Sequence, residues 1–106
     1  IKTGGEWVSS LEVEDLISRH PAVSEVAVIG VKDAKWGERP LAVVVLKDVE
    51  GVDAAGIRQH LGEYANRGTI SKYAVPETVV FVSTLDRTSV GKLDKKRLRE
   101  RYSAAP

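Results

Sequence analysis

The sequence predicts an α+β fold, with a small three-stranded sheet flanked by helices and the remnant of a hairpin at the N-terminus. Three observations lead to this prediction. Runs of β-branched residues alternate with stretches whose apolar residues follow helical spacing. Glycine, proline or a capping residue stands at the ends of these stretches. The 106 residues, 42% of them hydrophobic, suffice for one core, so we expect a single domain over residues 1–106.

The N-terminal segment predicts a turn followed by a helix. Gly4 and Gly5 stand side by side, a pair that is typical of a hairpin turn. Ser9 and Glu12 have the spacing of a capping box, in which the serine side chain accepts a hydrogen bond from the amide three residues on. A helix should therefore begin after Ser9. Pro21 should end it, because proline cannot continue the hydrogen-bonding pattern.

Two strands are expected next. Residues 26–31 and 41–46 are short apolar runs rich in valine, which favours strands. The second run is apolar throughout, as expected for a strand that is covered on both faces. Residues 32–40 between them carry many charges and predict a loop.

The second half of the chain predicts a helix, a strand and a short final helix. Asp53 can cap the first of these helices, and Gly68 stands where a glycine commonly ends one. Residues 78–82 form a β-branched run and predict the third strand. Asp94 can cap the final helix, after which residues 103–106 are expected to fray.

The charge of the chain is balanced overall and uneven locally. Sixteen basic and fifteen acidic residues give a net charge of +1, short of the excess typical of a dedicated nucleic-acid-binding protein. Residues 92–101 contain six basic and two acidic residues, a net charge of +4. A solvated helix face explains this segment, and binding of the phosphates of a ligand is the alternative.

The composition excludes several kinds of site. The chain has no cysteine, which removes disulfides and thiolate chemistry and favours the reducing cytoplasm. Its two histidines, His20 and His60, cannot form a metal site alone, and we expect structural roles for both. No apolar run reaches the length of a membrane span. Because the chain begins at Ile1 without an initiator methionine, we expect it to be part of a longer protein.

Lys92 is the first candidate for chemistry. It follows Gly91 at the end of the polar loop 83–91, which invites comparison with a phosphate-binding loop. That pattern requires a glycine where this chain has Asp86 and a serine or threonine where it has Leu93, so the comparison fails. What remains is a long cationic side chain suited to reach a phosphate or carboxylate, and a solvated surface lysine fits the same pattern.

The second candidate is the segment around Gly4 and Gly5. Two glycines without Cβ atoms allow another backbone or a thin ligand, such as a pantetheine arm, to approach closely. A plain hairpin turn explains the same pair. Three aromatic residues are expected to serve packing or an interface: Trp7, Trp36 and Tyr73.

Five segments, in this order and spacing, resemble the C-terminal domain of adenylate-forming acyl-CoA synthetases, especially the medium- and long-chain fatty acyl-CoA ligases. The segments are residues 1–17, 20–31, 35–47, 75–82 and 88–99. Enzymes of that family join a carboxylate to the α-phosphate of ATP, release pyrophosphate, and then transfer the acyl group from AMP to the thiol of CoA. The small domain rotates between the two half-reactions.

The resemblance implies roles for individual residues. Lys92 matches the lysine that reaches the α-phosphate and the carboxylate in the first step. Gly4, Gly5 and Glu6 match the segment that lines the pantetheine tunnel in the second step. Lys2 matches a lysine that lies near the adenylate in the thioester-forming arrangement. The resemblance also implies that ATP, CoA and Mg²⁺ are used by the full-length enzyme together with its large N-terminal domain, and that the isolated domain binds none of them and is inactive.

One departure concerns the loop before Lys92. The family commonly has proline where this chain has Asp86, so we expect a less rigid loop before Arg87. The same proline belongs to the pattern associated with reversible acetylation of the lysine, and such regulation is therefore not implied for this chain.

Several other functions remain compatible with the sequence. The chain could be a free-standing binding module whose basic C-terminal helix contacts nucleic acid or an acidic partner. It could be the same domain from an aryl-CoA ligase or a peptide-synthetase adenylation domain, or a domain that kept the fold and lost the chemistry. The carboxylic acid used and the oligomeric state are left open, because acid selectivity belongs to the large domain of the family.

Overall fold

The computed structural model describes residues 1–47 and 51–103. The strands are β1 (Lys2–Thr3), β2 (Glu6–Trp7), β3 (Val23–Asp33), β4 (Gly37–Leu46) and β5 (Thr78–Phe81). The helices are α1 (Ser10–Ser18), α2 (Ala54–Asn66) and α3 (Lys95–Ser103), and the short 3₁₀ helix η1 (Lys72–Ala74) precedes β5. None of the helices in these two ranges has both the length and the apolar run needed to cross a membrane.

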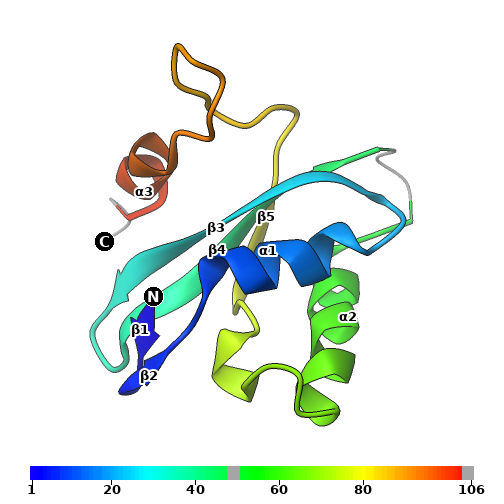
Figure 1. Cartoon of the computed structure of the whole chain (residues 1–106), viewed down its shortest axis with the longest axis vertical. Coiled ribbons are helices and arrows are strands. Elements are labelled where there is room, and N and C mark those ends of the chain that lie inside the picture. Colours follow the sequence, from blue (N-terminus) through cyan, green and yellow to red (C-terminus); the bar gives the residue numbers. More distant parts are fainter. Residues whose placement is uncertain (48–50, 104–106) are drawn as a thin grey trace.

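All five strands belong to one sheet, in which β4 is central (Figure 1). β3 and β4 form a long antiparallel pair, and β5 adds to β4 in parallel. The N-terminal hairpin joins the same edge of β4 as β5, through the pair Thr3↔Gly37. The predicted α+β class and its three main strands are confirmed, and the hairpin extends the sheet that they form.

The prediction of a loop over residues 32–40 is wrong, because β3 and β4 continue through most of this segment. Their register runs as far as the pair Asp33↔Gly37, which leaves only a tight turn between them. Asp33 Oδ1 accepts hydrogen bonds from the amides of Lys35 and Trp36 at 2.8 and 2.9 Å, and Gly37 has φ +85°. The charges suggested a loop because the end of this ribbon projects into solvent, where charged side chains and strand pairing are compatible.

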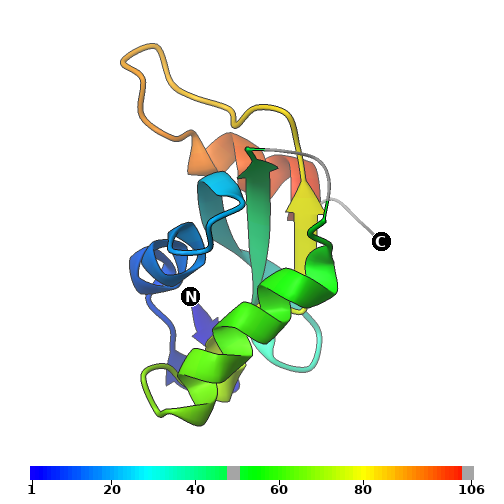
Figure 2. The ribbon, with the colours of Figure 1, turned by 90° about the vertical axis from the view of Figure 1, so that its right-hand side faces the viewer.

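Helices cover both faces of the sheet. Figures 1 and 2 show α1 and α2 on one side and α3 on the other. The side chains of β4 alternate between the two resulting cores: Ala42 and Val44 belong to the first, and Leu41, Val43 and Val45 belong to the second. The expectation that this strand is covered on both faces is therefore confirmed.

The predicted helix caps are also confirmed. The side chains of Ser9, Asp53 and Asp94 each accept a hydrogen bond from the amide three residues on, at 3.2, 2.8 and 3.1 Å. Gly68 follows α2 with φ +80°, a conformation that glycine adopts without strain. Of the predicted frayed segment, Ser103 is the last residue of α3, and residues 104–106 lie outside the described residues.

Candidate functional sites

The predicted site residues lie in two separate places. Lys2, Gly4, Gly5 and Glu6 come together in the β1–β2 hairpin, whereas Lys92 lies in the loop between β5 and α3. Figure 1 shows this loop, in orange, at one end of the molecule and the hairpin, in dark blue, at the other. No single binding site can therefore use both within this domain alone.

The loop that carries Lys92 is itself a small hairpin, which the sequence did not predict. The amide of Thr88 donates to the carbonyl of Lys92 at 2.7 Å, and the amide of Gly91 donates to the carbonyl of Thr88 at 2.9 Å. Gly91 has φ +85°, and Arg87 and Leu93 close the hairpin as an isolated bridge. A turn followed by a glycine at positive φ is a common way to close such a hairpin. Lys92 thus sits on an ordered backbone.

Arg87 fastens this hairpin to the sheet. Its Nη1 donates to the carbonyl of Gly91 at 2.9 Å, next to Lys92, and its Nη2 pairs with the carboxylate of Glu25 on β3. The guanidinium group can serve both partners because it presents several donors in a fixed plane. Arg87 therefore connects the residue before Lys92 with the sheet.

Asp86 makes two contacts with α3 and the residue before it, while the expectation that its presence leaves the loop less rigid stays a prediction. Its carbonyl accepts a hydrogen bond from the amide of Asp94 at 2.9 Å. Its Oδ2 lies 3.2 Å from Nη2 of Arg101 on α3, as an ion pair without good hydrogen-bond alignment. A polar side chain thus ties the loop to the following helix where the family commonly has the rigid ring of proline.

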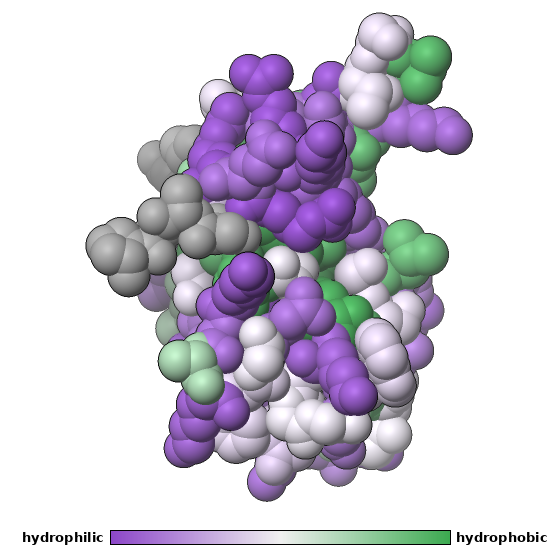
Figure 3. Space-filling model, turned by 90° about the vertical axis from the view of Figure 1, so that its left-hand side faces the viewer, coloured by the Kyte–Doolittle hydropathy of each residue, from purple (hydrophilic) through white to green (hydrophobic). Residues whose placement is uncertain are grey.

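Lys92 is exposed, and its side chain makes no hydrogen bond or ion pair within residues 1–47 and 51–103. Two of the other basic residues of the segment are paired with acids of other elements: Lys95 with Glu14 at 2.7 Å, and Arg101 with Asp86. The remaining basic residues are exposed: Lys96, Arg97 and Arg99. Figure 3 shows hydrophilic side chains gathered over the half of the molecule that contains α3. Lys92 therefore lies beside a solvated basic helix face, which attracts anions.

The β1–β2 hairpin has a two-residue turn made by Gly4 and Gly5. Their φ angles are +58° and +86°, and the pair Thr3↔Glu6 flanks them. Two successive residues at positive φ define the turn type that best fits the twist of a hairpin. Residues that carry a side chain rarely adopt these φ angles. The hairpin turn that the sequence predicted is confirmed.

The two glycines face different surroundings. A Cβ atom on Gly4 would lie 2.8 Å from a ring carbon of Trp36, so the indole packs directly against the backbone. A Cβ atom on Gly5 would meet nothing within 4 Å. Gly4 therefore serves packing inside the domain, and Gly5 leaves an open stretch of backbone that another molecule can approach.

The turn between β3 and β4 places Trp36 against Gly4. The carbonyl of Trp36 accepts a hydrogen bond from the amide of Gly4 at 2.9 Å. The hydrogen bonds from the two amides to Asp33 hold this turn. They also lower the pKa of the Asp33 carboxyl, the bond from Trp36 having the larger effect and that from Lys35 the smaller. The ring of Trp36 also contacts that of Tyr73, with centroids 5.7 Å apart, which agrees with the packing role expected for both.

Lys2, Glu6 and Trp7 project from the hairpin near its turn. Glu6 Oε2 accepts a hydrogen bond from Oγ of Ser71 at 3.0 Å, which joins the hairpin to the start of η1. Nζ of Lys2 lies 5.4 Å from the centroid of the Trp7 ring. Trp7 is 78% exposed, so the indole does not pack within the described part of the domain.

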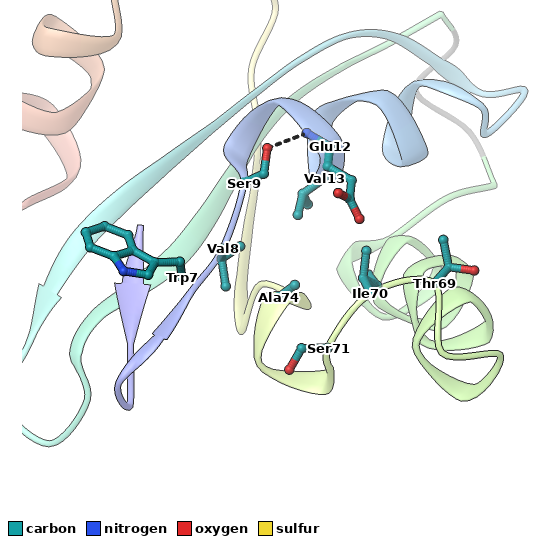
Figure 4. Close-up of a pocket in the computed structure, with 9 residues that line it drawn as sticks. All are labelled: Trp7, Val8, Ser9, Glu12, Val13, Thr69, Ile70, Ser71 and Ala74. Carbon is teal, nitrogen blue, oxygen red and sulfur yellow. Dashed lines mark hydrogen bonds between the residues drawn. The ribbon is translucent and has the colours of Figure 1, made fainter.

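A pocket of about 230 Å³ lies beside this hairpin, between the start of α1 and η1 (Figure 4). Apolar side chains line part of it, among them Val8, Val13 and Ile70. The polar lining residues are Ser9, Glu12, Thr69 and Ser71. In Figure 4 the indole of Trp7 extends away from the other side chains. None of the nine lining residues is basic, so the pocket is poorly suited to a phosphate group.

Both histidines contact backbone groups, His60 across from α2 to α1 and His20 just after α1. His60 Nε2 lies 2.8 Å from the carbonyl oxygen of Leu16, and His20 Nδ1 accepts from the amide of Ala22 at 3.1 Å. Their ring centroids are 5.1 Å apart. These contacts agree with structural roles. The described part of the chain holds no group of three or more side chains that could bind a metal ion.

Comparison with known proteins points to one family. The sequence pattern of the AMP-binding enzyme C-terminal domain matches residues 12–92. The long-chain-fatty-acid–CoA ligase of Thermus thermophilus is 40% identical over 102 residues, which are 96% of this chain and 18% of that enzyme. The mitochondrial malonate–CoA ligase of Homo sapiens is 45% identical over 98 residues, which are 92% of this chain and 16% of that enzyme.

Solved structures agree with the sequence relatives. The ATP-bound structure of MatB from Rhodopseudomonas palustris superposes with a TM-score of 0.88 and 38% sequence identity. The alignment covers 98% of this chain and 20% of that one. The chain thus spans about a fifth of the length of the proteins that it matches.

Proposed function

The chain belongs to the family of AMP-binding enzyme C-terminal domains, and from this premise we propose that it is the mobile C-terminal domain of an acyl-CoA synthetase that acts on a fatty acid. The observation that carries the proposal is the separation of the two candidate segments. The loop that carries Lys92 stands at one end of the domain and the β1–β2 hairpin at the other. A domain that rotates can present each segment to the same substrates in turn.

In the first half-reaction the fatty acid carboxylate attacks the α-phosphorus of ATP, and pyrophosphate leaves. We assign Lys92 to this step. Its ammonium group can contact both the carboxylate oxygen and the α-phosphate oxygens, where negative charge gathers in the transition state. The hairpin fastened by Arg87 and Asp86 supports this assignment, because a cation contributes most when its position is fixed before the reaction.

In the second half-reaction the sulfur of CoA attacks the acyl carbonyl carbon, and AMP leaves. We assign the segment Lys2–Glu6 to this step. The open backbone at Gly5 can lie against the thin pantetheine arm of CoA. Lys2 is exposed on the same hairpin, and its cationic side chain suits the phosphate of the adenylate.

Fatty acid is the proposed substrate class, supported by the resemblance of the segment 35–40 to fatty acyl-CoA ligases. The relatives include a ligase named for long-chain fatty acids and one named for malonate, at similar identity. The aryl-CoA ligase and peptide-synthetase alternatives differ in the acid or the acceptor and share the use of Lys92. Which acid is bound depends on the large domain.

In this proposal the whole enzyme uses ATP and CoA as substrates and Mg²⁺ as a cofactor. The partner of this domain is the large N-terminal domain of the same enzyme. ATP use is supported by the ATP-bound relative. Lys92 and the hairpin meet the ligands only when the large domain supplies the acyl pocket and the adenine site. The cytoplasmic location expected from the sequence stays a prediction.

The test uses the full-length parent enzyme as wild type, Lys92→Ala and Lys96→Ala. Lys96 is a matched control, because it is an exposed lysine of the same basic segment. Adenylation is measured by pyrophosphate exchange, and thioester formation is measured with preformed acyl-AMP and CoA. We expect Lys92→Ala to reduce adenylation by about a hundredfold or more, as loss of a transition-state contact does, and to leave thioester formation unchanged.

Two results would contradict the assignment. If Lys92→Ala and Lys96→Ala behave alike in both half-reactions, Lys92 has no special role, and the resemblance describes the fold alone. If thioester formation falls as far as adenylation, the division of labour between the two ends of the domain is wrong. The binding-module alternative would instead appear as nucleic-acid binding that weakens steeply with salt.

A further inference from the structure

A buried arginine lies directly beneath the glycine hairpin. Arg39 on β4 is 8% exposed, and Thr3 on β1 is fully buried; these are the two buried polar or charged residues of the described part of the chain. Arg39 Nη1 donates to Oγ1 of Thr3 at 3.1 Å. Burying a guanidinium group is unfavourable unless partners satisfy it, so this position is not explained by packing alone.

The other contacts of Arg39 connect the hairpin with distant parts of the chain. Nη1 also donates to the carbonyl of Tyr73 in η1 at 3.4 Å, and Nη2 lies 3.7 Å from the carboxylate of Glu77, just before β5. Nε of Arg39 is buried and has no partner within the described residues. One cation thus links β1, η1 and the start of β5.

Ser71 and Tyr73, at the start of η1 and within it, support the glycine turn in two further ways. The hydrogen bond between Ser71 and Glu6 holds the strand that follows the turn. The ring of Tyr73 packs on that of Trp36, which in turn lies against Gly4. The turn is therefore held on both of its strands and at its first glycine.

These side-chain contacts have consequences because the hairpin is small. β1 and β2 have two residues each, and only Thr3 pairs with β4. An isolated two-stranded hairpin is marginally stable in water, so contacts outside the strand pairing determine where such a hairpin lies.

We propose that Arg39 is a positioning residue for the thioester-forming step: by holding Thr3 and the backbone of η1 it fixes the Gly4–Gly5 turn where the open backbone of Gly5 receives the pantetheine arm of CoA. This inference rests on the proposed function. In this proposal Arg39 does not contact a substrate. Its effect on the reaction passes through the position of the turn.

The test compares the two half-reactions of the full-length parent enzyme in wild type and Arg39→Lys. Lysine keeps the charge and loses the planar fork that serves three partners. We expect thioester formation from preformed acyl-AMP to fall about tenfold with a raised KM for CoA, as a slightly misplaced binding element does, while pyrophosphate exchange is unchanged. If the two half-reactions fall equally, or if neither changes, the inference is overturned.

A second variant covers the case in which Arg39→Lys does not fold. Thr3→Val removes the hydroxyl acceptor at nearly constant shape and leaves the charge in place, so it should produce the same selective loss in a milder form. Glu63→Gln is the control, because Glu63 forms an exposed ion pair with Arg67 and is not a partner of Arg39; its half-reactions should match those of the wild type. A Thr3→Val enzyme with an unchanged KM for CoA would overturn the inference.

Hydrogen exchange of the same enzymes separates the inference from a purely structural role. The amides of residues 1–8 should exchange faster in Arg39→Lys and Thr3→Val than in Glu63→Gln, together with the change in KM. Faster exchange with normal thioester formation would overturn the inference. Failure of the proposed function is a different result: Lys92→Ala would then leave adenylation intact, whatever Arg39 does.

Discussion

At the scale of single residues, the two glycines of the hairpin separate packing from ligand approach. Both have positive φ angles, but only a side chain at Gly4 would collide with Trp36. A side chain at Gly5 would project into open space, where we place the pantetheine arm of CoA. Substitution by alanine should therefore cost more stability at the first position than at the second, and should affect function at the second.

We expect Gly5→Ala to destabilise the domain by about 1–2 kcal/mol, the usual penalty for a side chain at positive φ, and Gly4→Ala to destabilise it further because of the collision. Thermal unfolding of the 106-residue chain measures both. In the parent enzyme, Gly5→Ala should slow thioester formation from acyl-AMP and spare adenylation. Equal unfolding temperatures for the two variants would contradict the packing argument.

Arg39, Ser71 and Arg87 are residues whose roles the sequence did not predict. Arg39 left one signal, since it is a charged residue immediately before a continuous apolar run, where a buried ion must find partners. Ser71 and Arg87 left none, because their partners Glu6 and Glu25 lie 65 and 62 residues away in the chain. Such contacts exist only after the sheet has formed.

At the scale of elements, the hairpin that carries Lys92 is expected to act as one unit. Its backbone bonds hold Lys92 relative to Gly91, and Arg87 holds the whole hairpin relative to β3. Breaking the link to β3 should therefore affect the function of Lys92 without touching Lys92 itself.

We expect Glu25→Gln in the parent enzyme to slow adenylation by about tenfold, the order of effect of a modest misplacement, and to leave thioester formation unchanged, because the hairpin at the other end of the domain is not involved. Asp15→Asn is a suitable control, since Asp15 forms an exposed ion pair with Arg19, the residue that follows α1. If Glu25→Gln and Asp15→Asn enzymes adenylate at the same rate, Arg87 does not position Lys92.

At the scale of the whole molecule, the two segments that we assign to the two half-reactions lie at opposite ends of the domain, and the acyl and adenine sites are assigned to the large domain. The 106-residue chain alone should therefore form no acyl-AMP from fatty acid, ATP and Mg²⁺, and no acyl-CoA from acyl-AMP and CoA. Both reactions can be followed by chromatography with the parent enzyme as the positive control. Turnover by the isolated chain near the rate of the parent enzyme would contradict the assignment of the acyl and adenine sites to the large domain.

Local signals in the sequence determined the fold class, the helix caps, the glycine turn and the three main strands. These features depend on neighbours a few residues apart: the caps at Ser9, Asp53 and Asp94 bind amides three residues on, and the Gly4–Gly5 turn needs only two residues without Cβ atoms. The apolar run of β4 also predicted that this strand is buried on both faces. The family was recognisable for the same reason, since its motifs are continuous segments.

Tertiary structure alone decided how these segments are placed and held. It extended β3 and β4 through the predicted loop, joined the hairpin to β4, and set the loop that carries Lys92 and the glycine turn at opposite ends of the molecule. It also decided that the loop at Asp86 is anchored to α3 by Arg101. The physical reason is common to all of these: strand pairing and ion pairs between residues far apart in the chain depend on the global path of the backbone, which no local pattern of residues encodes.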